Sequence, residues 1–197
     1  PLGKLQPLGK LQPLGQHEAL GQLQPLRQLQ DQQARQAEAV MSILPHTHPL
    51  FEDPHRPWGP PLTDAGVDSF EKLLGLTIPV ALRAVLLRTN GGSLRRTHIG
   101  AAAGRTTLRI RDLAGIGYAE GLEASPSLAT EWGYPRPCLV LSAEGPRAFL
   151  LDYRRSGPHG EPAVVFVDTD QEVAGRPLEW TLSPTIGAFL DRLTHWN

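Results

Sequence analysis

The sequence predicts an α+β fold, a single domain in which helices cover an antiparallel meander of about four to six strands. Three observations lead to this prediction. Helical patterns occupy residues 63–90, strand patterns dominate the middle of the chain up to residue 168, and a helical pattern returns after residue 183. The loop between two of the strand patterns, residues 143–146, has hairpin length, and such loops join antiparallel strands, whereas parallel strands need longer crossovers.

Composition divides the chain into three parts. Residues 1–40 hold ten glutamines and no aromatic residue, and they begin with the hexapeptide Pro-Leu-Gly-Lys-Leu-Gln written twice. Recurrent proline and glycine oppose a continuous helix, so we expect this low-complexity leader to be disordered, with residues 26–44 as the stretch that could form a Gln-rich helix. Residues 41–62 form a Pro-rich lead-in, and residues 63–197 form the expected folded domain.

Two residues that occur once bear on processing and compartment. Met41 is the only methionine and directly follows the leader, so we interpret it as the natural start, or residues 1–40 as a repeat-expanded extension. Cys138 is the only cysteine, which excludes an intramolecular disulfide and favours a reducing, cytoplasmic location. No run approaches the roughly 18 consecutive apolar residues of a membrane span, so no membrane association is expected.

Two helices are predicted at the start of the domain. Thr63 or Asp64 caps the first, and Gly75 stops it. Its apolar positions recur at i, i+3 and i+7: Val67, Phe70 and Leu74. The second begins with Pro79 as its first residue and ends at the turn formed by Asn90, Gly91 and Gly92, so these four residues are assigned structural roles. Its buried positions are Leu82, Val85 and Leu86.

The middle of the domain is predicted to be mostly strands. Residues 107–111 alternate apolar and basic side chains, as a half-buried strand does, and a short helix fits residues 127–132. Strands over residues 138–142, 147–153 and 163–168 should then form an antiparallel meander. The last helix is expected to use Ser183 as its cap and Pro184 as its first residue. Its apolar face comprises Ile186, Phe189, Leu190 and Leu193.

The residue patterns contain no catalytic motif. Cys138 and Ser142 fall within a strand pattern and lack a strand-to-helix glycine elbow, so neither is expected to be a nucleophile. His46, His48 and His55 have the residue types of a zinc site, but the prolines around them provide no helix or strand to fix ligand geometry. We therefore expect no catalytic residue, no metal, no cofactor and no small-molecule substrate.

Charge is distributed unevenly although the formal net charge is −1. Residues 72–111 contain eight basic residues and no acid, whereas residues 112–197 contain twelve acids and six arginines. One interpretation is that the domain has two oppositely charged faces that meet different partners. The other is that the two segments interleave in the folded domain and their charges pair.

Three motifs occur in a fixed order. Residues 70–76 read Phe-Glu-Lys-Leu-Leu-Gly-Leu and are followed by Ile78-Pro79 and by Asn90-Gly91-Gly92; residues 150–154 are followed by residues 160–168; and the last helix pattern covers residues 186–193. In this order they resemble the SUKH superfamily, the Smi/Knr-like domains, over residues 63–193. The resemblance implies a SUKH-like α+β domain and leaves residues 1 to about 60 without a counterpart.

What the resemblance implies is a binding module and not an enzyme. Bacterial members are mostly immunity proteins that neutralise a toxin encoded nearby, often a nuclease, by direct binding, and fungal members are cell-wall and signalling regulators. We therefore expect a protein partner, with a cognate toxin as the leading candidate. The alternative is a regulatory or nucleic-acid-binding protein that uses the basic stretch from Arg83 to Arg111, and it would predict affinity that falls steeply with salt.

Six residues are candidates for contact with the partner. An acidic rim is expected from Asp152, Glu161, Asp168 and Asp170, because acidic groups steer association with a basic active site. The alternative for Asp152 is that it accepts hydrogen bonds from its own loop or pairs with Arg154 or Arg155. Aromatic residues that could act as interface anchors, or else as buried edge residues, complete the set: Trp132, Tyr153 and, outside the six, Trp180.

Overall fold

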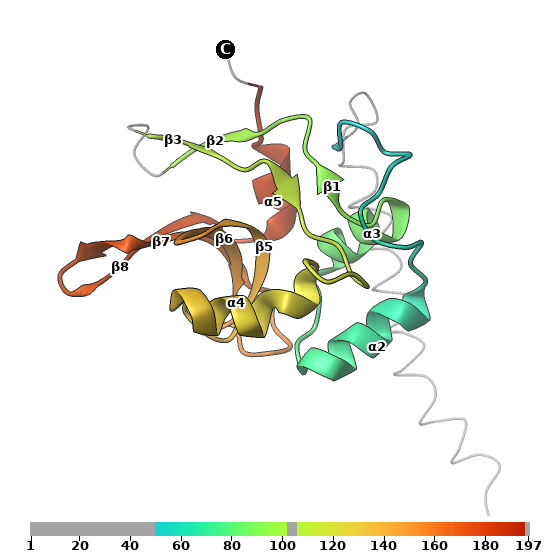
Figure 1. Cartoon of the computed structure of the whole chain (residues 1–197), viewed down its shortest axis with the longest axis horizontal. Coiled ribbons are helices and arrows are strands. Elements are labelled where there is room, and N and C mark those ends of the chain that lie inside the picture. Colours follow the sequence, from blue (N-terminus) through green and yellow to red (C-terminus); the bar gives the residue numbers. More distant parts are fainter. Residues whose placement is uncertain (1–49, 102–105, 196–197) are drawn as a thin grey trace, which may run out of the picture. The chain divides into compact units, whose positions relative to one another are not determined.

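A computed structural model describes residues 50–101 and 106–195, all within one unit that spans Ala37–Asn197 (Figure 1). These residues form helices and antiparallel sheets, which confirms the predicted α+β class. The expectations for the leader, for Met41, for His46 and His48, and for a helix over residues 26–44 lie outside the described residues.

The main sheet has four strands in the order β5-β6-β7-β8, and each strand is antiparallel to its neighbour. The strands are β5 (Cys138–Glu144), β6 (Arg147–Asp152), β7 (Ala163–Val173) and β8 (Arg176–Ser183). The meander of the first three strands is as predicted, although Glu144 pairs with Arg147, so the turn between β5 and β6 is only Gly145-Pro146.

Strand β8 was not predicted. It contains Pro177, which removes a ladder donor and weakens the strand pattern, and most of its side chains are exposed or only half-buried. Its last residue is Ser183, which the sequence had suggested as the cap of the final helix. That cap is wrong: α5 (Ile186–Asp191) is capped by Thr185, whose Oγ1 accepts a hydrogen bond of 3.2 Å from the amide of Ala188.

The first two helices largely agree with their sequence signals. Helix α2 (Asp64–Leu74) starts at Thr63, whose Oγ1 accepts from the amide of Gly66 at 3.2 Å, and ends at Gly75 with φ of 66°. Helix α3 (Val80–Arg88) follows Pro79, which is the N-cap residue and not the first helical residue as expected. α3 also stops two residues before the predicted Asn-Gly-Gly turn.

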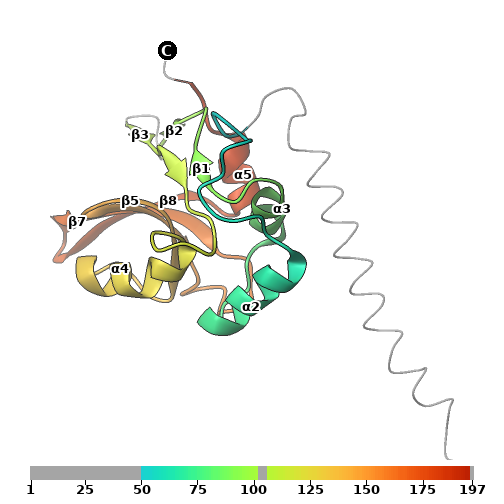
Figure 2. The same cartoon turned by 45° about the vertical axis from the view of Figure 1, so that its right-hand side comes forward.

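The sheet carries different elements on its two faces (Figure 2). Helix α4 (Ser125–Trp132), preceded by the short 3-10 helix η2 (Leu122–Ala124), covers one face and packs against Ala148, Leu150 and Val167. The other face packs against α3 and α5 in the main core. That face contributes Leu139, Leu141, Phe149, Leu151, Val164 and Phe166.

Two small sheets lie before the meander. Strand β1 (Gly92–Ser93) pairs with β4 (Asp112–Leu113), and β2 (His98–Gly100) pairs with β3 (Thr107–Arg109). The strand predicted over residues 107–111 therefore ends at Arg109, and β4 begins only at Asp112, because the chain passes from one partner to the next at Ile110 and Arg111. Strand β4 leads into the main sheet, where the amide of Ala114 donates to the carbonyl of Leu141 at 2.8 Å.

Asn90 joins three segments of the domain. Its side chain is only 2% exposed, and its Nδ2 donates to the carbonyls of Pro60 and Ile116, both at 2.7 Å. Its Oδ1 accepts from the amide of Ile116, also at 2.7 Å. The carboxamide thus binds the Pro-rich lead-in and the loop after β4 to the turn that follows α3.

Glycine is needed around this carboxamide. A Cβ on Gly59 would lie 2.2 Å from Nδ2 of Asn90, and a Cβ on Gly115 would lie 2.4 Å from Oδ1. Gly91 has φ of 77°, and a Cβ there would lie 2.6 Å from the amide nitrogen of Gly115. The Asn90-Gly91 pair therefore forms a close junction between backbones and does not act as a helix stop.

The lead-in contributes to this junction. Phe51 is buried and forms a β-bridge with Leu94, and the amide of Gly59 donates to the carbonyl of Asn90 at 2.9 Å. Residues 50–62 therefore pack on the domain although their prolines prevent regular secondary structure.

We expect Asn90→Ala to lower the free energy of unfolding by about 3 kcal/mol, because it leaves the buried carbonyl and amide of Ile116 and the partly buried carbonyl of Pro60 without their partner. Asn90→Asp has the same shape but places an acceptor opposite the two carbonyls, so it should destabilise the fold as well. Urea denaturation measures both. Ser69→Ala, on the exposed face of α2, is the control and should change stability by less than about 0.5 kcal/mol. Equal stability of Asn90→Ala and the unaltered chain would contradict this role.

Candidate functional site

A groove of about 300 Å³, which we call the hairpin groove, lies between the β2–β3 hairpin and the main sheet. The sheet provides an aromatic floor of Phe149, Phe166 and Trp180. The ring centroids of Phe149 and Phe166 are 5.4 Å apart, and the two rings meet edge to face. The ring centroids of Phe166 and Trp180 are 5.8 Å apart. Because all three residues belong to paired strands, this floor is rigid.

Arginines border the hairpin groove: Arg109, Arg111 and Arg147. Nε of Arg147 donates to Oδ2 of Asp168 at 2.9 Å, and Nε of Arg111 lies 3.0 Å from Oε1 of Glu144. Asp168 is only 1% exposed and also accepts from Nε2 of Gln171 at 2.8 Å. The groove therefore combines an apolar floor with a rim on which arginines outnumber acids by one.

A second hollow of about 580 Å³, which we call the edge hollow, extends along β8. Arg154 organises it, because Nε and Nη2 bind the two carboxylate oxygens of Asp152 at 2.9 Å each and Nη2 also binds Oε2 of Glu179 at 2.5 Å. Burial alone would raise the pKa of Asp152, but the hydrogen bonds from Arg154 outweigh it and lower that pKa. Arg155 and Arg176 complete the charged lining.

The predicted acidic residues do not form one rim. On β6, Arg147 pairs with Asp168 of β7 and Asp152 pairs with Ala163. Successive side chains of a strand point to opposite faces, so Asp152 lies on the face opposite to Arg147 and Asp168. Asp152 instead makes the contacts of the alternative interpretation: it binds Arg154 and accepts from the amide of Arg154 at 3.0 Å. Asp170 is exposed on β7 beyond Asp168.

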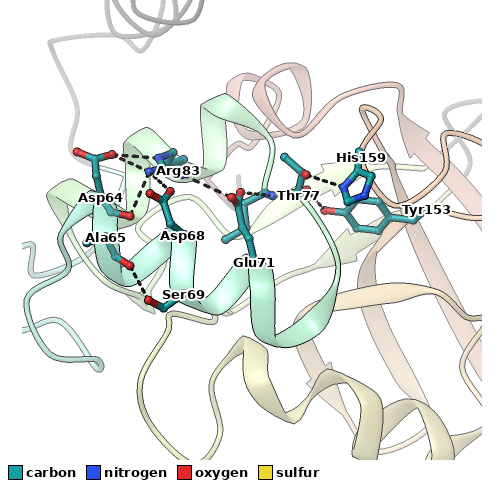
Figure 3. A network of polar contacts seen from close by, with 10 residues as sticks. Asp64, Ala65, Asp68, Ser69, Glu71, Thr77, Arg83, Tyr153 and His159 are labelled. Carbon is teal, nitrogen blue, oxygen red and sulfur yellow. Dashed lines mark hydrogen bonds and ion pairs between the residues drawn. The ribbon is translucent and has the colours of Figure 1, made fainter. Parts of the chain in front are cut away.

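The two aromatic candidates and Glu161 also lie apart. Tyr153 is fully buried, and its hydroxyl donates to the carbonyl of Thr77 at 2.7 Å (Figure 3). Burial raises the pKa of its phenol. Its side chain therefore ties the loop after β6 to the segment before α3 and is not part of the exposed surface. Glu161 is exposed in that loop, and Trp132 is half-buried against the apolar cluster beneath α4.

The basic stretch is partly neutralised by acids from elsewhere in the chain. Nη2 of Arg83 lies 2.9 Å from Oδ1 of Asp64 and 2.7 Å from Oδ1 of Asp68, both on α2 (Figure 3). Glu71 of α2 lies 3.7 Å from Arg83 and accepts from the amide of Ile78 at 2.8 Å. These acids lie outside the segment of residues 112–197. The Arg111–Glu144 pair does join the basic and the acidic segment, as in the interpretation in which the two segments interleave.

Cys138 is not placed for nucleophilic chemistry. It is buried in the cluster beneath α4, and burial, with a smaller contribution from Asp152, raises the pKa of its thiol to about 12. Within residues 50–101 and 106–195, no three His, Cys, Asp or Glu side chains are grouped as a metal ion requires. None of the helices in these ranges has the length and apolar character needed to cross a bilayer.

Sequence reasoning missed most of the hairpin groove. The alternation of β6 and β7 places Phe149 and Phe166 on one face, and this signal was available. Trp180 was considered as an interface anchor, but neither it nor Leu178 could be placed on this face, because β8 was not predicted. Arg109 was counted in the basic stretch, but only the tertiary fold brings β3 over the sheet.

Comparison with known proteins gives one family. A family model described as the SMI1/KNR4 family (SUKH-1) matches residues 61–192. This range contains α2 to α5, including both hollows. No curated protein matches the chain significantly.

The lowered pKa of Asp152 predicts a pH-dependent contribution to stability. A carboxylate with a lowered pKa in the folded state stabilises the fold above its unfolded pKa of about 3.9, and this contribution disappears as the pH falls through the folded value. Asp152→Asn should therefore lower the free energy of unfolding at pH 7. The loss should be only about 1 to 2 kcal/mol, because Arg154 is partly exposed and solvent screens the pair. The difference should shrink toward pH 3. Denaturation at both pH values measures it, with exposed Asp170→Asn as the control. A loss that is the same at pH 3 and pH 7 would contradict the ion-pair explanation.

The raised pKa of Cys138 predicts a slow thiol. Only the thiolate reacts with iodoacetamide, and a pKa of about 12 leaves very little thiolate at pH 8. Alkylation of the folded chain should therefore be at least about 100-fold slower than that of free cysteine, and urea should restore the normal rate. Mass spectrometry over time measures the adduct. Fast labelling without urea would show that the thiol is accessible.

Proposed function

The chain belongs to the SMI1/KNR4 family (SUKH-1), and on this premise we propose that it is a non-enzymatic module that binds one protein partner. The partner we favour is a cognate toxin encoded nearby, which this protein neutralises by direct binding as an immunity protein. We further propose that it acts in the cytoplasm, where its single buried thiol would stay reduced.

The hairpin groove is the observation that carries this proposal. Protein-binding sites are typically built from a few aromatic and arginine anchors on a rigid support, surrounded by polar groups. The floor of Phe149, Phe166 and Trp180 and the arginines above it meet this description. Trp180 is half-exposed and lies on the edge strand, so a partner can reach it without opening the fold.

The class of toxin follows less directly. A basic nuclease site would be steered toward an acidic surface, but Asp152, Asp168 and Glu144 are each paired with an arginine. Asp170 and Glu172 are exposed in the last part of β7. A nuclease therefore stays one candidate among toxins, and it is supported by these two exposed acids and not by a continuous acidic face.

The alternative of nucleic-acid binding has weaker support. Arg83 and Arg111 of the basic stretch already hold carboxylates at 3.0 Å or less. Phosphate contacts there would need these ion pairs to break or share their donors. No arrangement of the described residues favours a nucleic acid over a protein.

We expect the chain to co-purify with the product of a neighbouring gene and to protect cells that express that product. Trp180→Ala should weaken the complex at least about tenfold, because it removes a central aromatic anchor. Titration calorimetry measures the affinity. Trp58→Ala is the matched control, since Trp58 is an exposed tryptophan that lines neither hollow. The proposal would be contradicted if none of the neighbouring gene products bound the chain, or if the two substitutions weakened binding equally.

A further inference from the structure

We propose that the partner binds the free edge of β8 with an extended acidic segment, which adds a fifth strand to the main sheet. This inference rests on the proposed function and specifies how the partner is bound. Strand β8 is the last in the order β5-β6-β7-β8, so the outward backbone groups of an edge strand are available for pairing. The opposite edge differs, because Ala114 binds β5 there.

The open part of this edge is short and has definite ends. Pro177 lacks an amide hydrogen and limits pairing at one end. At the other end, Nη1 of Arg192 donates to the carbonyl of Leu182 at 2.6 Å. Between them, residues 178–181 make no backbone hydrogen bond to any described element except β7. An added strand would therefore pair over about these four residues.

The two hollows meet at this edge. Leu178 and Trp180 line both the hairpin groove and the edge hollow. Because successive side chains of a strand point to opposite faces, a segment paired with β8 would direct its side chains alternately to the hairpin groove and to the edge hollow. The aromatic floor of the hairpin groove suits apolar side chains, and such pockets give an added strand its specificity.

Charge decides the kind of segment that fits. The hairpin groove has three arginines and two acids, and the edge hollow also has three arginines and two acids. In the edge hollow, Arg154 is held by Asp152 and Glu179, whereas Arg155 and Arg176 are exposed and have no ion pair among the described residues. Carboxylates on the added segment would complement these arginines.

This charge argues against two other occupants. The first seventeen residues of the leader contain Lys4 and Lys10 and no acid, so the leader repeat is basic. A second copy would offer its own β8, which has one arginine and one glutamate and therefore no excess of negative charge. An acidic segment from a different protein matches the edge better than either.

Two matched peptides test the chemistry on the full chain. One alternates Glu and Val over eight residues, and the other alternates Lys and Val. The Glu peptide should bind at least about tenfold more tightly than the Lys peptide, and its binding should weaken at high salt. It should also slow exchange of those amides among residues 178–181 that point away from β7. Equal or tighter binding of the Lys peptide, or no protection of these amides, overturns the inference. Protection of these outward-pointing amides in the free chain also overturns it, because the leader or a second copy then occupies the edge.

Substitutions separate this inference from the proposed function. Arg109 lines the hairpin groove and Arg176 lines the edge hollow, so Arg109→Glu and Arg176→Glu are the test variants. Arg88→Glu on α3 is the control. All three arginines are exposed and have no ion pair among the described residues. With the partner protein, the first two should weaken binding at least about tenfold and the control should not. If the partner binds all three equally, the edge inference is wrong and the protein-binding proposal stands. If no partner is found, the proposed function fails, and the peptide titration alone decides the edge.

Discussion

The three hydrogen bonds of the Asn90 side chain are the constraint on which the rest of this domain depends. They connect the carbonyl of Pro60 with the backbone of Ile116, so the lead-in, the turn after α3 and the loop after β4 cannot move independently. The β2–β3 hairpin lies between Asn90 and Ile116 in the sequence, and both ends of this excursion are therefore held. Since Ala114, the residue after β4, also donates to the carbonyl of Leu141 in β5, the junction sets the position of the hairpin over the sheet, and with it the hairpin groove.

The near-zero net charge of the chain conceals ion pairs between distant segments. Arg83 is held by acids of α2, Arg111 by Glu144, and Arg147 by Asp168. Exposed pairs of this kind add little to stability, because solvent screens them and two long side chains lose freedom. Their larger effect is on orientation, since a paired guanidinium is held in one place. Three arginines of the two hollows, Arg111, Arg147 and Arg154, are thus held by carboxylates.

Family membership and geometry support the same class of function by different routes. The family indicates a binding module, and the sheet offers rigid aromatic residues beside arginines, with a free strand edge where the two hollows meet. Two side chains that were considered for chemistry or for partner contact have structural positions instead: Cys138 is buried, and the hydroxyl of Tyr153 donates to a backbone carbonyl. The recognition surface that we propose therefore comprises β6 to β8 and the hairpin above them.

The sequence by itself determined the local elements whose signals lie within a few residues. Thr63 and Gly75 define α2, and the dense apolar runs of β5 to β7 define three strands, because caps and strand alternation act over short distances. Only the tertiary structure decided the role of Asn90, the existence of β8 and the separation of Asp152 from Asp168 onto opposite faces. Each of these depends on partners many residues away: Asn90 on Pro60 and Ile116, β8 on β7, and each carboxylate on the register of its strand. A pattern of neighbouring residues does not contain that register. The surface that we propose for binding could therefore be assembled only from the paired strands.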